Sequence, residues 1–277
     1  MSFLLDQLNI HSVDDVVQTI QNFRWEAGVT PFSSIWSPII GSLGYLVVIY
    51  LLQVYMKNRK EVKLHYICLA HNLFLSLLSL VMLLGVMVPL FITEIPQGLY
   101  HMVCAPKTDG TVSFFYYIFY LSKVYEFLDT IFLVLRKKKL IFLHVYHHFI
   151  TFWLCWVNLV ENTGVQWGDI SANCFVHIIM YYYYYQCEQG NNPWWKKYIT
   201  RVQIIQFVFD MSLHGMWHYY VGTSTPCNGS LRGTLFSDFV IMSFLMLFLQ
   251  FYFRSYKRPA ASSAAAVASN KDQKKTQ

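Results

Sequence analysis

Three histidines lie close together in an otherwise apolar segment, KKKLIFLHVYHHFITFWLCW at positions 137–156. If this segment is helical, His144, His147 and His148 share one face, because residues three and four apart are neighbours on a helix. An imidazole at membrane depth is costly unless it faces a protein interior or a polar cavity. The pattern therefore predicts a buried reaction centre; histidines that only bond to main-chain carbonyl groups are the alternative.

A second polar group occurs in KVYEFLDT at positions 123–130. Lys123, Glu126, Asp129 and Thr130 fall within about a third of the circumference of a helix, at roughly 100° per residue. Charges inside a bilayer must neutralise one another or face a polar space. Two interpretations stay open: an ion-paired packing cluster, or groups that contact the three histidines.

The segment NCFVHIIMYYYYYQ at positions 173–186 carries a third polar face. Asn173 and His177 are one helical turn apart, and Met180, Tyr181 and Tyr184 continue the same side. Tyrosines near a helix end are common at the membrane interface. That explanation covers the tyrosines but not Asn173 and His177, which lie deeper in the segment.

A fourth polar stripe follows in TRVQIIQFVFDMSLH at positions 200–214. It consists of Gln203, Gln206, Asp210 and His214, with Thr200 at its edge. Amide side chains can bind neighbouring helices, or they can donate hydrogen bonds to an oxyanion. Four successive helices that each carry a polar face predict one enclosed polar chamber.

The composition indicates which kind of structural element carries these polar faces. The chain has 277 residues, of which 55% are hydrophobic, 18% aromatic and 13% charged, which is typical of an all-α, polytopic membrane protein. A spanning helix needs about 20 mostly apolar residues. Seven segments qualify as transmembrane helices: 35–56, 67–92, 114–135, 141–160, 169–187, 198–222 and 234–254.

Basic residues predict the orientation, because Lys and Arg remain on the cytosolic side. They follow the first, third and seventh segments and precede the sixth: Lys57, Arg59, Lys60, Lys63, 136–139, Lys196, Lys197, Arg254, Lys257 and Arg258. The opposite side has Arg24, Lys107 and Arg232. We therefore expect a luminal N-terminus and a cytosolic C-terminus. This distribution accounts for the net charge of +6, so no nucleic-acid partner is expected.

Three parts of the chain are expected: a luminal segment 1–34, a membrane domain 35–256, and a disordered cytosolic tail 257–277. The tail is small, polar and low in complexity. Its Lys274 and Lys275 resemble the dilysine retrieval signal of endoplasmic-reticulum membrane proteins. We therefore expect the protein in the endoplasmic-reticulum membrane.

Two cysteines, Cys104 and Cys227, fall in non-cytosolic loops of this topology, where an oxidising compartment favours disulfides. They are the predicted disulfide pair. The remaining four lie in or at the ends of helices, where a small buried hydrophobic residue is the simpler explanation. Asn228 begins a glycosylation sequon on the same side, and the sequence does not decide whether it is used.

Taken together, the four polar segments resemble, in order and spacing, the signature motifs of the ELO family of fatty acid elongases. These motifs are K-x-x-E-x-x-D-T, H-x-x-H-H, N-x-x-x-H-x-x-M-Y-x-Y-Y and T-x-x-Q-x-x-Q, and each motif position is matched. The resemblance implies seven helices, with spans two to seven forming a barrel around a narrow acyl tunnel and the first helix packed outside.

The resemblance also implies an activity: the condensing step of elongation, in which acyl-CoA and malonyl-CoA give 3-ketoacyl-CoA, CoA and carbon dioxide. No cofactor or metal is expected beyond these substrates. Membrane lipid and the later enzymes of the cycle (ketoacyl-CoA reductase, dehydratase and enoyl-CoA reductase) are the expected partners. A homodimer is left open.

A neutral imidazole can attack a thioester, and no cysteine with a basic neighbour is expected in the core of the chamber, so histidine is the expected nucleophile. The resemblance places this role on His147, with His177 as its partner. His144 and His148 are expected to orient groups and exchange protons, and Asp129 to fix a tautomer as in a hydrolase triad.

The other site residues have binding roles. Asn173 and Gln203 are candidate donors to developing oxyanions, and Lys123 is expected to pair with Glu126 or Asp129. Lys137 and Lys196 suit the CoA phosphates at the cytosolic mouth. The remaining substrate-binding candidates are Gln206, Tyr181 and Tyr184.

Two other protein classes share some of these features. Di-iron membrane desaturases and hydroxylases also use H-x-x-H-H, since neutral imidazoles are good iron ligands. They need several histidine boxes, however, whereas this chain has one box and isolated His177, His214 and His218. A seven-helix receptor has the same number of spans, but it gives no reason for charges in the third span and three histidines in the fourth.

Overall fold

The computed structural model describes residues 12–106 and 110–256. The tail with Lys274 and Lys275 lies outside these ranges, as do three basic residues used to predict the orientation, Lys107, Lys257 and Arg258.

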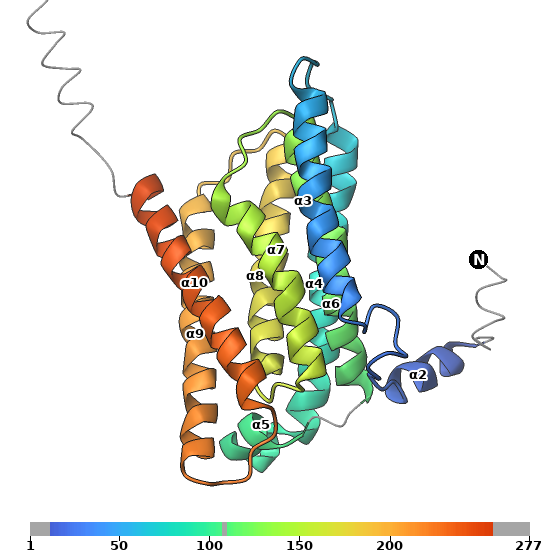
Figure 1. Cartoon of the computed structure of the whole chain (residues 1–277), viewed down its shortest axis with the longest axis vertical. Coiled ribbons are helices and arrows are strands. Elements are labelled where there is room, and N and C mark those ends of the chain that lie inside the picture. Colours follow the sequence, from blue (N-terminus) through green and yellow to red (C-terminus); the bar gives the residue numbers. More distant parts are fainter. Residues whose placement is uncertain (1–11, 107–109, 257–277) are drawn as a thin grey trace, which may run out of the picture.

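The described part of the chain is helical and contains no strand, which confirms the all-α prediction (Figure 1). Its elements are α2 (Val13–Gln21), α3 (Trp36–Met56), α4 (His65–Thr93), the short 3₁₀ helix η1 (Ile95–Gln97), α5 (Leu99–Cys104), α6 (Gly110–Leu135), α7 (Phe142–Val160), α8 (Gln166–Glu188), α9 (Lys196–Gly222) and α10 (Leu231–Tyr256).

Within residues 12–106 and 110–256, three helical segments are both long and apolar enough to cross a membrane: Trp36–Met56, His65–Gln97 and Leu231–Tyr256. Their outward surfaces are apolar; Tyr66 and Ile92 of α4, for example, are 82% and 70% exposed. An apolar surface of this kind is expected against lipid rather than water. The chain is therefore a membrane protein. The helices α6, α7, α8 and α9 have the length of a span, but they carry the polar faces noted in the sequence.

Six long helices contact one another in a closed order. α4 packs against α8, α8 against α9, α9 against α10, α10 against α7, α7 against α6, and α6 against α4. The first long helix, α3, packs against α6 and α7, and Figure 1 shows it alongside α6. Because each helix in this order faces two neighbours, the polar faces of α6, α7, α8 and α9 meet inside the bundle.

Basic residues gather at one end of the bundle. At one end, the loop after α3 lies against the loop after α6: Val62 N–H donates to Leu135 O (2.9 Å), and Lys137 Nζ donates to Lys57 O (3.3 Å). The basic residues that follow α3 and α6 are therefore neighbours in space. We call this end the basic end.

Candidate active site

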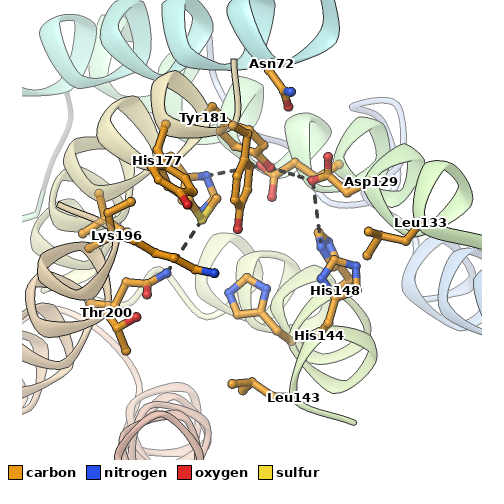
Figure 2. Close-up of a pocket in the computed structure, with 18 of the residues that line it drawn as sticks. Asn72, Asp129, Leu133, Leu143, His144, His148, His177, Tyr181, Lys196 and Thr200 are labelled. Carbon is orange, nitrogen blue, oxygen red and sulfur yellow. Dashed lines mark hydrogen bonds and ion pairs between the residues drawn. The ribbon is translucent and has the colours of Figure 1, made fainter. Parts of the chain in front are cut away.

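A cavity of about 420 Å³ lies inside the bundle and extends to the basic end. All four site histidines line it: His144, His147 and His148 from α7, and His177 from α8. Figure 2 shows His144 and His148 across the cavity from His177 and Tyr181. The other predicted residues that line it are Glu126, Asp129, Asn173, Tyr181, Tyr184, Lys196, Gln203 and Gln206. The polar faces of four helices thus share one chamber.

Hydrogen bonds from side chains of α6 and α3 hold His144 in place. Its Nε2 lies 2.8 Å from Oγ1 of Thr130, and that oxygen lies 2.9 Å from the hydroxyl of Tyr45 on α3. Thr130 is fully buried and Tyr45 is 4% exposed. A buried chain of hydrogen bonds fixes the orientation of its members, so the ring of His144 has a defined position.

Asp129 organises the neighbouring part of the wall. Its Oδ1 accepts from Nε2 of His71 on α4 (2.7 Å), and its Oδ2 accepts from the hydroxyl of Tyr181 on α8 (2.7 Å). Oδ2 also lies 4.0 Å from Nε2 of His148. The carboxylate therefore bridges three helices and lies beside one histidine of the box.

His147 is in a different situation from its neighbours. No other side chain among the described residues hydrogen-bonds to a ring nitrogen of His147; its ring contacts are with His148 (5.5 Å between centroids) and Phe244 (5.0 Å). It lines both the large cavity and a smaller one of about 50 Å³. Among the described residues, His147 is thus the histidine of the box with neither a side-chain hydrogen bond nor a carboxylate beside its ring nitrogens, and it lines both cavities.

Lys123 and Glu126 form a buried ion pair of 2.8 Å on α6, with side chains 3% and 2% exposed. Lys123 Nζ also donates to Oδ1 of Asn173 (3.3 Å), and His177 Nδ1 lies 3.9 Å from Glu126. Of the two partners expected for Lys123, the structure selects Glu126. Because Oδ1 of Asn173 accepts from Lys123, the amide nitrogen Nδ2 remains available as a donor.

The smaller cavity continues from the chamber away from the basic end. Both cavities are lined by His147, Asn173, Gln206 and Phe207. The smaller one also has apolar walls, including Leu154 and Ile241. Of the two glutamines, Gln206 donates to Asp210 (3.3 Å), whereas Gln203 contacts the sulfur of Met180 (3.7 Å).

At the basic end, the mouth of the cavity is lined by the ion pair of Arg136 with Glu188 and by the exposed Lys196. Arg136 makes a two-pronged contact with Glu188, with Nη2 3.3 Å from Oε2. Lys196 is exposed and lines the cavity. Lys137 was predicted to serve the same mouth, but it is not among the lining residues, and its ammonium is bonded to the main chain of Lys57.

The sequence predicted no cysteine with a basic neighbour in the core of the chamber, and the structure places three thiols along the two cavities. Cys68 and Cys187 line the large cavity, and Cys155 lines the smaller one together with His147. Cys68 even has a basic neighbour, since Arg136 Nη1 lies 3.5 Å from its sulfur. The helix faces that these cysteines occupy were not among the predictions from the sequence. A test of the nucleophile must therefore include these thiols.

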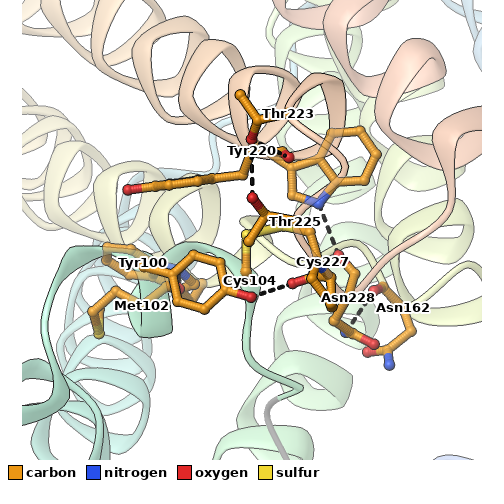
Figure 3. The surroundings of a disulfide bond; sticks show 12 residues. Tyr100, Met102, Cys104, Asn162, Tyr220, Thr223, Thr225, Cys227 and Asn228 are labelled. Atoms are coloured by element: carbon orange, nitrogen blue, oxygen red, sulfur yellow. Dashed lines mark hydrogen bonds between the residues drawn. A yellow bond between two sulfur atoms is a disulfide. The ribbon is translucent and has the colours of Figure 1, made fainter.

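The opposite end of the bundle is closed by a disulfide between Cys104, at the end of α5, and Cys227, in the loop before α10 (Figure 3). This is the pair expected from the topology. Asn228 N–H donates to Cys104 O (2.8 Å), and Trp217 Nε1 donates to Asn228 O (2.7 Å). The side-chain amide of Asn228 donates to Asn162 O (3.3 Å).

Several residues around the chamber were not predicted from the sequence. His71 and Tyr45 lie on the mostly apolar helices α4 and α3, outside the four polar segments, and were not singled out. A second buried network was also missed: His214 lies between Asp238 (2.6 Å) and Asp169 (3.2 Å), and His218 bonds to Asp238 (2.7 Å). His214 had been noted only as part of a stripe, and the isolated carboxylates of α8 and α10 were the available signal.

Comparison with known proteins agrees with the motifs. A sequence profile described as the GNS1/SUR4 family (ELO) matches residues 30–264. The chain is 58% identical to "Fatty acid elongase A" of Dictyostelium discoideum over 251 residues, which cover 89% of this chain and 93% of that protein. It is 35% identical to mouse "Very long chain fatty acid elongase 2" over 229 residues, 78% of this chain and 75% of the relative.

Proposed function

Because the chain belongs to the GNS1/SUR4 (ELO) family of fatty acid elongases, we propose that it is the condensing enzyme of elongation. In this reaction, a long-chain acyl-CoA, malonyl-CoA and one proton give 3-ketoacyl-CoA, free CoA and carbon dioxide. The observation that carries the proposal is that the three histidines on α7 have different surroundings. Thr130 holds His144 and Asp129 lies beside His148, whereas His147 faces both cavities.

In the first half-reaction, a ring nitrogen of His147 attacks the thioester carbonyl carbon. The bond from carbon to sulfur breaks, CoA leaves, and the proton lost from the other ring nitrogen passes to the CoA sulfur. The product is an acyl-imidazole. His177, which lines the same cavity, is the partner in this centre, and the free amide nitrogen of Asn173 and that of Gln203 are the donors for the developing oxyanion.

In the second half-reaction, malonyl-CoA loses carbon dioxide, and the resulting carbanion attacks the acyl carbon. The bond from carbon to the imidazole nitrogen breaks, and His147 takes up a proton to regain its neutral form. Asp129, beside His148, orients the imidazoles that exchange this proton, as the buried carboxylate of a hydrolase triad does.

The mouth of the cavity at the basic end suits the CoA portion of both substrates. Lys196 is an exposed cation on the cavity lining, and ammonium groups form charge-assisted hydrogen bonds with phosphate oxygens. The apolar walls of the smaller cavity, beyond His147, suit the first part of the acyl chain. Substrate thus enters at the basic end with its thioester at His147.

We also propose how the enzyme is arranged in the membrane. The seven long helices act as seven membrane spans, and the six that contact one another in closed order form a barrel around the acyl site. The basic end faces the cytosol, the disulfide end faces the lumen of the endoplasmic reticulum, and no metal or other cofactor takes part. The product passes to the later enzymes of the cycle.

The histidine-box oxygenase alternative is not favoured. Among the residues that the structure describes, no group of three or more His, Cys, Asp or Glu side chains is arranged to hold a metal ion. Three of the site histidines instead have other partners: His144 bonds to Thr130, His148 lies beside Asp129, and His177 lies beside Glu126.

The test is a burst experiment with purified protein. Wild-type protein given acyl-CoA alone should release about one equivalent of CoA, and it should give ketoacyl-CoA once malonyl-CoA is added. His147→Ala should give no burst, whereas His101→Ala, a histidine on α5 remote from the cavity, should behave as wild type. Parallel double-reciprocal lines are expected, as for other covalent mechanisms.

Cysteine variants separate the histidine from a thiol nucleophile. Cys68→Ser, Cys155→Ser and Cys187→Ser should all retain the burst. Loss of the burst in one of them, with His147→Ala still active, would assign the acyl group to that sulfur. CoA release only after malonyl-CoA is added, with intersecting lines, would instead indicate a ternary complex.

A further inference from the structure

His71 lies on α4, outside the four sequence motifs, yet it makes one of the two hydrogen bonds to Asp129. We infer that His71 is a positioning residue for the proposed condensation: it holds the carboxylate of Asp129 in the orientation from which Asp129 acts on His148. The inference rests on the proposed function, because it assigns a role within that reaction.

The hydrogen-bond partner of His71 shows which of its ring nitrogens carries a hydrogen. An ionised carboxylate only accepts hydrogen bonds, so the contact of 2.7 Å between Nε2 and Oδ1 of Asp129 requires a hydrogen on Nε2. The other nitrogen, Nδ1, is buried without a partner among the described residues. His71 is therefore the donor in this contact, and Asp129 is the acceptor.

The helix that carries Asp129 also clamps the ring of His71. Tyr125, four residues before Asp129, stacks on the ring at 5.2 Å with an interplanar angle of 25°. Phe132, three residues after it, meets the ring edge-on at 5.0 Å and 83°. Since both aromatic residues lie one turn from Asp129 on the same face of α6, the donor cannot turn away without losing its packing. The side chain of His71 is only 3% exposed.

The position of the Asp129 carboxylate affects the reacting histidine, His147, through His148. Oδ2 of Asp129 lies 4.0 Å from Nε2 of His148, and the rings of His148 and His147 are 5.5 Å apart. With both donors present, His71 and Tyr181 hold the carboxylate from two neighbouring helices, α4 and α8. Without His71, the carboxylate can rotate away from His148. The loss should therefore affect chemistry and leave substrate binding intact.

The experiment compares four variants with wild-type protein in acyl-CoA and malonyl-CoA assays. His71→Phe keeps an aromatic ring but removes the donor, and His71→Gln keeps an amide donor. Asp129→Asn removes the carboxylate, and the double variant His71→Phe/Asp129→Asn completes a cycle. Ser79→Ala, a buried polar residue on α4 that bonds only within its own helix, is the matched control. If His71→Phe does not fold, His71→Met replaces it.

We expect His71→Phe to lower kcat about ten- to a hundredfold, the loss typical of groups that orient a functional side chain, with KM for acyl-CoA changed less than twofold. His71→Gln should recover a large part of kcat, and Ser79→Ala should match wild type. In the Asp129→Asn background, His71→Phe should have almost no further effect. Independent, additive losses, or an unchanged kcat in His71→Phe, would overturn the inference. Absence of condensation in wild-type protein would overturn the proposed function instead.

Discussion

The hydroxyl of Tyr45 on α3 lies 2.9 Å from Oγ1 of Thr130 on α6, and the same oxygen lies 2.8 Å from Nε2 of His144. A helix that packs against the outside of the six-helix order thus contributes to the wall of the chamber. Asp129 and Thr130 are adjacent in sequence, and each connects a helix outside the four motifs to the histidine box: α4 through His71, and α3 through Tyr45. α6 is therefore the element that transmits the packing of α3 and α4 to α7.

Tyr45→Phe should lower kcat about two- to tenfold with little change in KM. The substitution removes one buried hydrogen bond, whose net contribution is about 0.5–1.5 kcal/mol, and leaves Thr130 free to rotate away from His144. Tyr50→Phe on the exposed face of the same helix (65% exposed) is the control, measured in the same steady-state assay. Equal kcat values for the two variants would show that α3 does not support His144.

Lys196→Ala should raise KM for both CoA substrates about three- to tenfold without changing kcat. Lys196 is the exposed ammonium on the cavity lining at the basic end, so its loss removes a charge-assisted contact with phosphate. Lys137→Ala is the matched comparison, because that ammonium is bonded to Lys57 O and does not line the cavity. The wild-type KM should also rise with salt. A larger effect from Lys137→Ala would move the phosphate site to the loop after α6.

Exhaustive chelation should leave the activity of purified protein unchanged. This follows from the proposed mechanism, in which imidazole and carboxylate groups carry out every proton transfer. Elemental analysis of the same sample provides the control. Stoichiometric iron whose removal abolishes turnover would contradict the acyl-imidazole mechanism. It would favour the alternative function, a histidine-box oxygenase.

The helices and the chamber were largely predictable, for identifiable reasons. Apolar runs gave the first long helix as 35–56, and the structure has Trp36–Met56. The histidines of α7 and the acidic residues of α6 were predicted to share an interior because spacings of three and four place them on one face. Such reasoning works within a helix, where geometry is fixed by local bonds.

Contacts between distant helices were not predictable in this way. His71 and Asp129 are 58 residues apart, and Tyr45 and Thr130 are 85 apart. Which polar residue of an apolar helix meets which partner depends on rotation and packing of whole helices, for which a single sequence has no periodic signal. The position of Cys155 beside His147 in the smaller cavity is a further case. The disulfide was the exception, because topology left only two cysteines on one side.

His214→Phe should destabilise the protein by about 3–5 kcal/mol, as expected when one partner of a buried ionic network is removed. His214 is fully buried and joins Asp169 of α8 to Asp238 of α10, so its loss leaves two carboxylates without their shared donor. Chemical unfolding in detergent gives the measurement. Ser212→Ala, an exposed residue of the same helix, should be neutral. Equal stability of the two variants would mean that this network does not hold α8, α9 and α10 together.

Cys104→Ser/Cys227→Ser should destabilise the protein by about 2–5 kcal/mol while leaving the active site intact in the protein that remains folded. The disulfide closes a loop of 123 residues, and cross-linking such distant positions restricts the unfolded chain strongly. It also ties the end of α5 to the loop between α9 and α10, the end of the bundle opposite the substrate mouth. Peptide mapping without reductant should recover the two cysteines as one linked peptide, and the paired variant Cys68→Ser/Cys187→Ser should keep wild-type stability. Recovery of both Cys104 and Cys227 as free thiols from membranes would place this end of the bundle in a reducing compartment, and the proposed orientation would then be wrong.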